Sequence, residues 1–210
     1  MMRILLVDDH AVVRDGIKRM FDERADSVSF GEADTAHGAL KLAEDQQWDV
    51  VVLDLTLGER SGLEVLKELK RLHPRLPVLI LSMHSEEQYA RRAFKAGASG
   101  YVTKDCSRAE LLAAIQKVGS GSKYVSVAMA EKLVTDLGRG TDGSPHELLS
   151  DREFEVLRLI ASGKTVGEAA EILSLSDKTI STYRARILEK MGMKTNAELT
   201  HYAIQNKLVK

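Results

Sequence analysis

The chain has few of the residues that mark a secreted or membrane-embedded protein. Its 210 residues include one cysteine, Cys106, so no internal disulfide can form and the several soft ligands of a zinc-finger site are missing. No apolar run approaches the ~20 residues of a bilayer-spanning helix. The short run at residues 2–7 is followed by acids, where a signal peptide would have a small-residue cleavage site. We therefore expect a cytoplasmic protein in a reducing compartment that does not contact a membrane.

An excess of one charge is also missing. The formal net charge is -1, and the hydrophobic and charged fractions, 44% and 29%, are those of an ordinary globular protein. Overall charge therefore indicates no partner. At roughly 100–200 residues per domain the length allows one or two domains, and a change of pattern after residue 118 favours two.

Up to that residue, short aliphatic and β-branched runs alternate with segments of helical spacing. The runs are residues 3–7, 27–33, 49–53, 76–82 and 100–104, and the helical segments are 11–22, 35–46, 61–72, 86–96 and 107–118. Strands that alternate with helices indicate a parallel sheet, with the most hydrophobic runs in its centre. We predict an α/β doubly wound, five-stranded, flavodoxin-like domain over residues 1–120.

A linker is predicted at residues 121–146. It follows a Gly/Ser break, contains an amphipathic segment that could form a helix near 126–137, and ends in the tether-like "GRGTDGSP" at 138–145.

The pattern of residues 147–210 is helical only, which predicts a small all-α domain. Four helices are expected at about 150–162, 166–173, 177–191 and 195–207. Ser150 with Glu153, and Thr165 with Glu168, have the spacing of capping boxes, and Ser176 can cap the third helix. Gly163 supplies a helix stop. The middle two helices are joined by the short turn "SLS", as in a helix-turn-helix motif.

Polar residues follow four of the predicted strands. Asp8 and Asp9 follow the first strand, Asp54 the third, Ser82 ends the fourth, and Lys104 ends the fifth. Because ligands of an open α/β sheet gather beyond the carboxyl ends of its strands, these side chains should converge. Three close carboxylates repel unless a cation joins them, and Mg²⁺ or another divalent cation suits such a site. Ser82 and Lys104 could then contact a phosphoryl group on a carboxylate.

Each residue also has a purely structural interpretation. Asp8 and Asp9 could cap a helix that begins near His10. Asp54 could be a loop carboxylate that accepts hydrogen bonds from backbone N–H groups. Ser82 could be an ordinary strand-end hydroxyl, and Lys104 a solvated surface amine. Their joint placement at the ends of central strands favours the chemical site.

The motifs "LLVDDH", "VVLDLTL", "LSMH" and "GYVTKD" resemble the CheY-like receiver domain of two-component response regulators, in the NarL/FixJ family. The resemblance implies that Asp54 accepts a phosphoryl group from a sensor histidine kinase. It implies that Asp9 binds Mg²⁺ directly, Asp8 largely through water, and Thr56 through its backbone carbonyl. Ser82 matches the switch hydroxyl, Lys104 the phosphate-pairing lysine and Tyr101 the aromatic switch. Gly58 and Asp105 stand where receivers often have proline, which suggests looser or differently turned loops.

The helix expected at 177–191 has one apolar side and one small, polar side. Its predicted core residues are Ile180, Tyr183, Ile187, Leu188 and Met191. The outward residues are Lys178, Ser181, Thr182, Ala185, Arg186 and Glu189, a face narrow enough for a DNA major groove. A solvated face of a helix bundle fits this pattern about equally well, because the chain from Pro145 onward has ten Lys and Arg against nine Asp and Glu.

The stretch from "LSDREFEVL" through "SDKTI" resembles the LuxR-type DNA-binding domain. Ser181, Tyr183 and Gly167 depart from residues usual in that family, so the resemblance implies the fold and DNA binding but does not assign the base contacts. We expect base-edge contacts from Ser181, Thr182 and Ala185. Phosphate contacts are expected from Lys178, Thr179, Arg184 and Arg186.

The combined prediction is a phosphorylation-controlled DNA-binding transcriptional regulator, not an enzyme. Its expected partners are a sensor histidine kinase, double-stranded promoter DNA, RNA polymerase and, when phosphorylated, a second copy of the chain in a homodimer. Phosphorylation would control dimerisation or release the recognition helix from the receiver. One alternative is an atypical regulator that binds DNA without phosphorylation. Another is a Mg²⁺-dependent phosphatase of the haloacid-dehalogenase type, which would need an acid where Thr56 stands.

Overall fold

The computed structural model describes residues 1–21, 27–58, 60–84, 86–127, 129–131 and 144–209. The chain divides into two compact units, Met1–Thr135 and Asp136–Lys210. Within the described ranges, no helix combines the length and the hydropathy needed to span a membrane.

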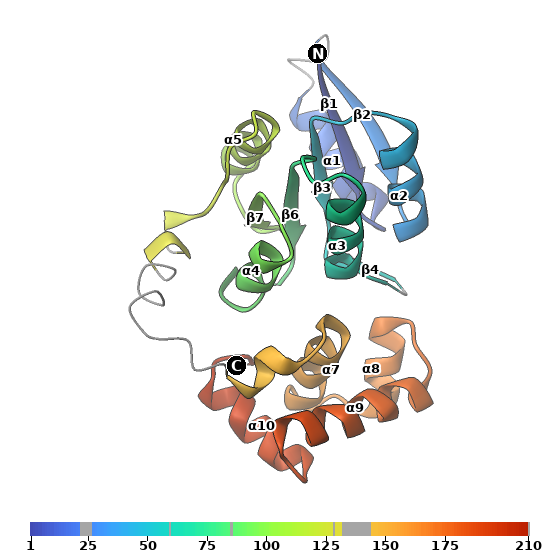
Figure 1. The fold of residues 1–210 in the computed structure, drawn as a ribbon, viewed down its shortest axis with the longest axis vertical. Helices are drawn as coiled ribbons and strands as arrows, with labels where there is room; N and C mark the ends of the chain where they lie inside the picture. Colours follow the sequence, from blue (N-terminus) through green and yellow to red (C-terminus); the bar gives the residue numbers. More distant parts are fainter. Residues whose placement is uncertain (22–26, 59, 85, 128, 132–143, 210) are drawn as a thin grey trace. The chain divides into compact units, whose positions relative to one another are not determined.

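Unit 1 is built around a sheet of five parallel strands (Figure 1). The strands are β1 Met2–Val7, β2 Val28–Ala33, β3 Val50–Leu53, β6 Val78–Ser82 and β7 Gly100–Thr103. Their spatial order is β2-β1-β3-β6-β7, and each neighbouring pair is parallel. The order reverses between β1 and β3, which is where a doubly wound sheet opens a crevice at its carboxyl edge. The predicted fold of this part is confirmed.

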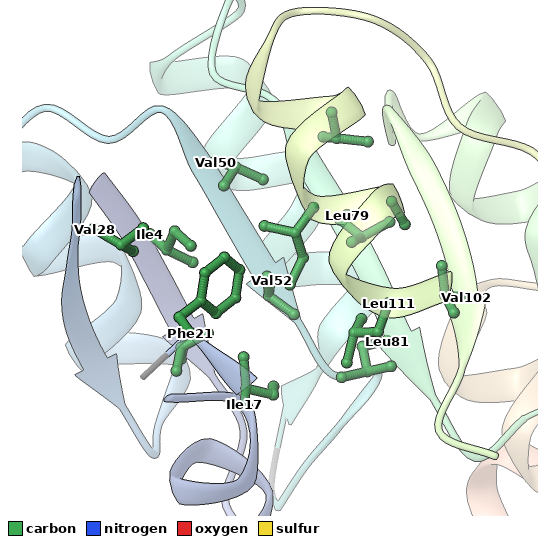
Figure 2. Packing of buried hydrophobic residues seen from close by; sticks show 14 residues of the cluster. Ile4, Ile17, Phe21, Val28, Val50, Val52, Leu79, Leu81, Val102 and Leu111 are labelled. Carbon is green, nitrogen blue, oxygen red and sulfur yellow. The ribbon is translucent and has the colours of Figure 1, made fainter. Parts of the chain in front are cut away.

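Helices cover both faces of the sheet. Buried side chains of α1 Ala11–Met20 and α5 Arg108–Gly119 share one hydrophobic cluster with the strands. Figure 2 shows Ile17 of α1, Phe21 directly after that helix and Leu111 of α5 packed over Ile4, Val52 and other strand residues. The other three helices, α2 Ala36–Asp45, α3 Gly62–Leu72 and α4 Glu86–Lys95, lie on the opposite face (Figure 1). Strands β3 and β6 are buried along their whole length, which explains why their sequences are continuously apolar.

Trp48, the single tryptophan, lies just before β3 and holds β2 in place. Its Nε1 donates to the carbonyl of Leu42 at 2.8 Å, and the guanidinium of Arg3 lies 5.2 Å from the ring centroid. The ring approaches Gly31 so closely that a Cβ on that residue would overlap it. Gly31 is therefore required by the packing of the indole.

Two features of unit 1 were not predicted. A short antiparallel hairpin follows Asp54, formed by β4 Thr56–Leu57 and β5 Arg60–Ser61, with Gly58 in the left-handed region at φ +52°. Tyr124, which we assigned to the linker, pairs with Gly100 of β7 and donates its backbone N–H to the Ser99 carbonyl at 2.9 Å. The helix expected near 126–137 falls largely on residues 128 and 132–143, outside the described part of the chain.

Unit 2 is helical, as predicted. It contains the 3₁₀ turn η2 Pro145–Leu148 and the helices α7 Asp151–Ala161, α8 Val166–Leu173, α9 Asp177–Met191 and α10 Asn196–Gln205. Both capping boxes form, and the Ser176 side chain accepts from the Thr179 N–H. Gly163 has a φ of +85° just after α7. The core of the unit includes Leu157, Ile160, Ala169, Leu173, Ile180, Ile187, Leu199 and Ala203.

Candidate functional site

Two buried carboxylates share one amine at the carboxyl edge of the sheet. Asp8 and Asp54, each one residue past its strand, are 4% and 3% exposed. Lys104, just past β7, places its Nζ 2.7 Å from Asp54 Oδ2 and 2.7 Å from Asp8 Oδ2. The edge of the sheet therefore joins residues from three separate strands.

The charges in this pocket are unbalanced. Burial raises the pKa of Asp54. The ammonium of Lys104 lowers this pKa and the charge of Asp8 raises it, and the net result is a pKa above the usual value. Burial also lowers the pKa of Lys104, but its hydrogen bonds to Asp54 and Asp8 outweigh this, and the net shift is upward. Lys104 therefore remains a cation between two acids, and the ionised pair of acids carries one negative charge more than the amine neutralises.

Asp9 and His10 complete a compact group of potential metal ligands. The Nδ1 of His10 lies 2.7 Å from Asp9 Oδ1, and its backbone N–H donates to Asp8 Oδ1 at 2.9 Å. Asp8, Asp9, His10 and Asp54 each offer one ligand atom, and these atoms lie within 4.8 Å of one another. Asp54 Oδ1 is buried and has no hydrogen-bond partner among the described residues. This oxygen-rich set fits a hard divalent cation such as Mg²⁺.

The remaining predicted pocket residues lie beside this group. Ser82, fully buried at the end of β6, accepts from the His84 N–H through Oγ at 3.2 Å and from the Lys104 N–H through its carbonyl at 2.9 Å. Tyr101 is buried in β7, and its hydroxyl donates to the His84 carbonyl at 2.8 Å. Ser82 and Tyr101 are thus joined through His84, whose ring stacks on Tyr89 with centroids 4.4 Å apart. Thr56 opens β4 with an exposed side chain.

The backbone around Asp54 is held by a close approach of α3. Gly62, the first residue of that helix, donates its N–H to the Leu55 carbonyl at 2.8 Å. A Cβ on Gly62 would overlap the carbonyl oxygen of Asp54 and the Cα of Leu55. Only a glycine fits at this position without moving the loop that carries Asp54.

Sequence reasoning missed the role of Arg14. Its Nη1 donates to the Asp8 carbonyl at 2.6 Å, and its Nε bonds to Glu32 Oε2 of β2 at 2.9 Å. The arginine therefore ties α1 to the backbone that carries Asp8. The available signal was the carbonyl of Asp8, a buried acceptor at the end of a strand that needs a donor.

In unit 2, α9 has the two faces that the sequence predicts. Ile180, Ile187 and Met191 are buried, and Tyr183 and Leu188 are half-buried. The residues predicted to face outward, Lys178, Ser181, Thr182, Ala185, Arg186 and Glu189, are all exposed, as are Asp177 and Lys190 at the two ends of the helix.

Two residues expected to contact phosphates are partly engaged within unit 2. The hydroxyl of Thr179 lies 2.8 Å from Ser176 Oγ at the helix cap. The Nε of Arg184 donates to Asn196 Oδ1 of α10 at 2.8 Å. Both residues are half-buried, whereas Lys178 and Arg186 are exposed.

Comparisons with known proteins match both units. Residues 4–116 match the family model described as response regulator receiver domain, and residues 147–203 match that of bacterial regulatory proteins, luxR family. The response regulator GacA of Pseudomonas viridiflava is 36% identical over 210 residues, covering 100% of this chain and 98% of that protein. The response regulator UvrY of Escherichia coli K12 is 33% identical over 209 residues, covering 99% and 96%.

Solved structures of regulators are similar as well. RcsB of Salmonella enterica serovar Typhimurium, bound to promoter rprA in the presence of the phosphomimetic BeF₃⁻, is 26% identical with a TM-score of 0.61, covering 96% of this chain and 98% of that chain. A LuxR-family response regulator from Aurantimonas sp. SI85-9A1 is 36% identical with a TM-score of 0.59, covering 65% and 98%.

Each unit thus matches its own family model, and the response regulators GacA and UvrY match along nearly the whole chain. This chain belongs to the NarL/FixJ family of two-component response regulators, DNA-binding transcription regulators that join a receiver domain to a LuxR-type helix-turn-helix domain.

Proposed function

We propose that Asp54 is the phosphoacceptor of this regulator and that a sensor histidine kinase is its donor. The phosphorus–nitrogen bond of the donor's phosphohistidine breaks as a carboxylate oxygen of Asp54 forms the new phosphorus–oxygen bond. The carrying observation is the environment of Asp54, a buried carboxylate whose Oδ2 lies 2.7 Å from Lys104 and whose Oδ1 has no hydrogen-bond partner among the described residues. An acyl phosphate at Asp54 adds oxygens that can accept from Lys104 and Ser82.

We further propose that a divalent cation, Mg²⁺ by preference, is held by Asp8, Asp9, Asp54 and the Thr56 carbonyl. The clustering of carboxylates within 4.8 Å and the excess negative charge of the pocket support this assignment. When bound, the cation offsets the negative charge of the incoming phosphoryl group. Lys104 supplies the second positive charge and holds the acceptor in place.

The output of phosphorylation is proposed to be dimerisation and binding of promoter DNA. Lys104 and Ser82 shift toward the new phosphoryl oxygens, and the hydrogen bonds of Ser82 and Tyr101 to His84 transmit the shift to the segment between β6 and α4. The changed surface favours pairing of two chains. Two α9 helices then reach half-sites about one helical turn apart.

We assign base-edge contacts to Ser181, Thr182 and Ala185, and phosphate contacts to Lys178, Thr179, Arg184 and Arg186. Exposure of the small residues in the middle of α9, with cations at its amino end and flank, supports the assignment. The amine and guanidinium of Lys178 and Arg186 are exposed, so they can reach phosphates without losing a contact described within unit 2.

Intact-mass analysis after incubation with Mg²⁺ and acetyl phosphate tests the acceptor. Wild type should gain one phosphoryl group, and Asp54→Asn, which keeps the size of the side chain, should gain none. An adduct on Asp54→Asn would mean that another residue is the acceptor. Absence of any adduct on wild type, together with unchanged DNA binding, would favour a regulator that acts without phosphorylation.

A further inference from the structure

We propose that the middle of the α9 face reads thymine methyl groups, so that the preferred half-site places thymines opposite Thr182 and Ala185. This inference rests on the proposed binding of promoter DNA by α9 and adds which bases that helix selects. It follows from the methyl groups that the exposed face of α9 presents and from the lack of side chains for bidentate hydrogen bonding at its centre.

The face offers little hydrogen-bonding chemistry at its centre. Bidentate readout of guanine uses Arg or Lys, and bidentate readout of adenine uses Asn or Gln. Among the exposed residues of α9, the cations Lys178 and Arg186 lie at the amino end and on the flank, and neither Asn nor Gln is present. A third exposed cation, Lys190, lies near the carboxyl end, where it pairs with Glu153. Between Lys178 and Arg186 lie Ser181, Thr182 and Ala185, whose short side chains allow the helix backbone to approach the bases closely.

The hydroxyl of Thr182 is already used inside the helix. Its Oγ1 donates to the Lys178 carbonyl at 2.9 Å, one turn back. This hydrogen bond fixes the rotamer of the side chain and commits its only O–H donor. The exposed Thr182 therefore offers DNA its γ-methyl group and an oxygen that can only accept.

Ala185 adds a second methyl group on the same face. Residues three apart in a helix have Cβ atoms about 5–6 Å apart. The bases of one strand follow each other at about 3.4 Å, so the two methyl groups match bases one or two steps apart. Thymine is the base that presents a methyl group in the major groove, and apolar contact from Ala or the Thr methyl is its usual complement.

The test replaces thymine by uracil, which differs only by the loss of that methyl group. Half-sites are first selected from a random duplex library with the full-length chain, and the selected thymines are then replaced one at a time. Wild type should bind about fourfold more weakly when the thymine opposite Thr182 is replaced, which is the effect of one buried methyl group. Two variants of Thr182 separate its methyl from its hydroxyl.

Thr182→Ser keeps the hydroxyl and its bond to Lys178 but lacks the methyl, so it should bind thymine and uracil sites equally. Thr182→Val keeps a methyl at that position and lacks the hydroxyl, so it should retain the preference for thymine. Ala185→Gly, with its helicity checked by circular dichroism, should remove a preference at a second position.

The inference fails if wild type binds a selected sequence but no replacement of thymine by uracil changes the affinity. The proposed binding of DNA by α9 would then still stand. The same holds if Thr182→Ser keeps the full preference at every position. If no sequence is enriched at all, the proposed reading of promoter DNA by α9 fails as well.

Discussion

At the scale of single residues, Lys104 determines how much the buried carboxylates Asp8 and Asp54 destabilise the folded protein. It is the cation that lies within 2.7 Å of both Asp8 and Asp54, and all three side chains are largely buried. Removing one partner of a buried ionic group leaves uncompensated charge, which is far more destabilising than loss of a surface ion pair.

Lys104→Met should therefore lower the free energy of unfolding by ~3–5 kcal/mol at pH 8. Without the amine, which lowers the pKa of Asp54, burial and the charge of Asp8 should raise that pKa further above its value in the unfolded chain. A group with a raised folded-state pKa destabilises the fold as the pH rises from its unfolded pKa through its folded pKa, so the loss of stability should be smaller at pH 5 than at pH 8. Urea denaturation at both pH values measures it. As a control, Lys123→Met replaces an exposed lysine and should change the free energy of unfolding by less than ~0.5 kcal/mol. If Lys104→Met loses the same stability at pH 5 and at pH 8, the loss does not come from uncompensated carboxylate charge.

Gly62→Ala should destabilise unit 1 by about 3 kcal/mol, because the new methyl group would overlap backbone atoms of Asp54 and Leu55 that cannot rotate away. Phosphorylation by acetyl phosphate should slow at the same time, since the loop that carries Asp54 must shift. Gly16→Ala is the matched control: Gly16 lies inside α1 with nothing within 4 Å of a Cβ, and alanine there should stabilise by ~0.5–1 kcal/mol. A Gly62→Ala variant as stable as wild type would show that the loop can relax.

The gathering of Asp8, Asp54 and Lys104 could be anticipated from sequence, because the carboxyl ends of parallel strands share one edge. The contacts of Arg14 could not, since the donation of its Nη1 to the Asp8 carbonyl depends on how far α1 lies from β2. Nor could the position of Ser82, whose Oγ accepts from the His84 N–H and, among the described residues, makes no hydrogen bond to the Asp54 carboxylate.

At the scale of elements, one carboxylate links the ends of two helices in unit 2. Glu153 accepts from the Ser150 N–H at 2.7 Å, which completes the capping box of α7, and from Lys190 Nζ of α9 at 2.7 Å. Burial raises the pKa of Glu153, but the bonds from Lys190 and Ser150 lower it more, so its pKa lies below the usual value. Helix α9 is thereby anchored near its carboxyl end.

Glu153→Gln should destabilise unit 2 by ~1–2 kcal/mol at pH 7, because the amide can still accept from Ser150 but loses the charge that pairs with Lys190. A carboxyl with a lowered folded pKa contributes stability above its unfolded pKa and loses it as the pH falls toward the folded value. The difference from wild type should thus shrink in acid. Thermal unfolding followed by circular dichroism measures it. As a control, Glu168→Gln alters the exposed capping box of α8, where Lys164 lies 3.5 Å from the carboxylate, and it should destabilise unit 2 less. If the two variants lose the same stability, the loss comes from helix capping and not from the pairing with Lys190.

The long elements were predictable because their hydrophobic periodicity extends over two or more turns or a whole buried strand. The hairpin β4–β5 was not, since strands of two residues have no periodicity. The sequence marks Gly58 only as a departure from the proline usual in receivers, yet its φ of +52° places it at the turn of this hairpin. The 3₁₀ turn η2 is likewise too short to be read from spacing.

At the scale of the whole molecule, the two units should be coupled through oligomeric state. With Mg²⁺ and beryllofluoride, which mimics a phosphoryl group on Asp54, wild type should shift from monomer toward dimer and bind its selected DNA at least tenfold more tightly. Sedimentation velocity and DNA titration measure the two effects. Asp54→Asn should show neither; a dimer that forms equally in Asp54→Asn would separate assembly from the carboxylate pocket.

The seating of Trp48 against Gly31 has an optical consequence. The chain contains one tryptophan, and it lies in unit 1 between β2 and the start of β3. At excitation wavelengths that tryptophan absorbs and tyrosine does not, only this indole should fluoresce. Its emission should therefore report the unfolding of Met1–Thr135, because Asp136–Lys210 contains no tryptophan. The intact chain thus carries a built-in fluorophore that distinguishes the unfolding of its two units without a label.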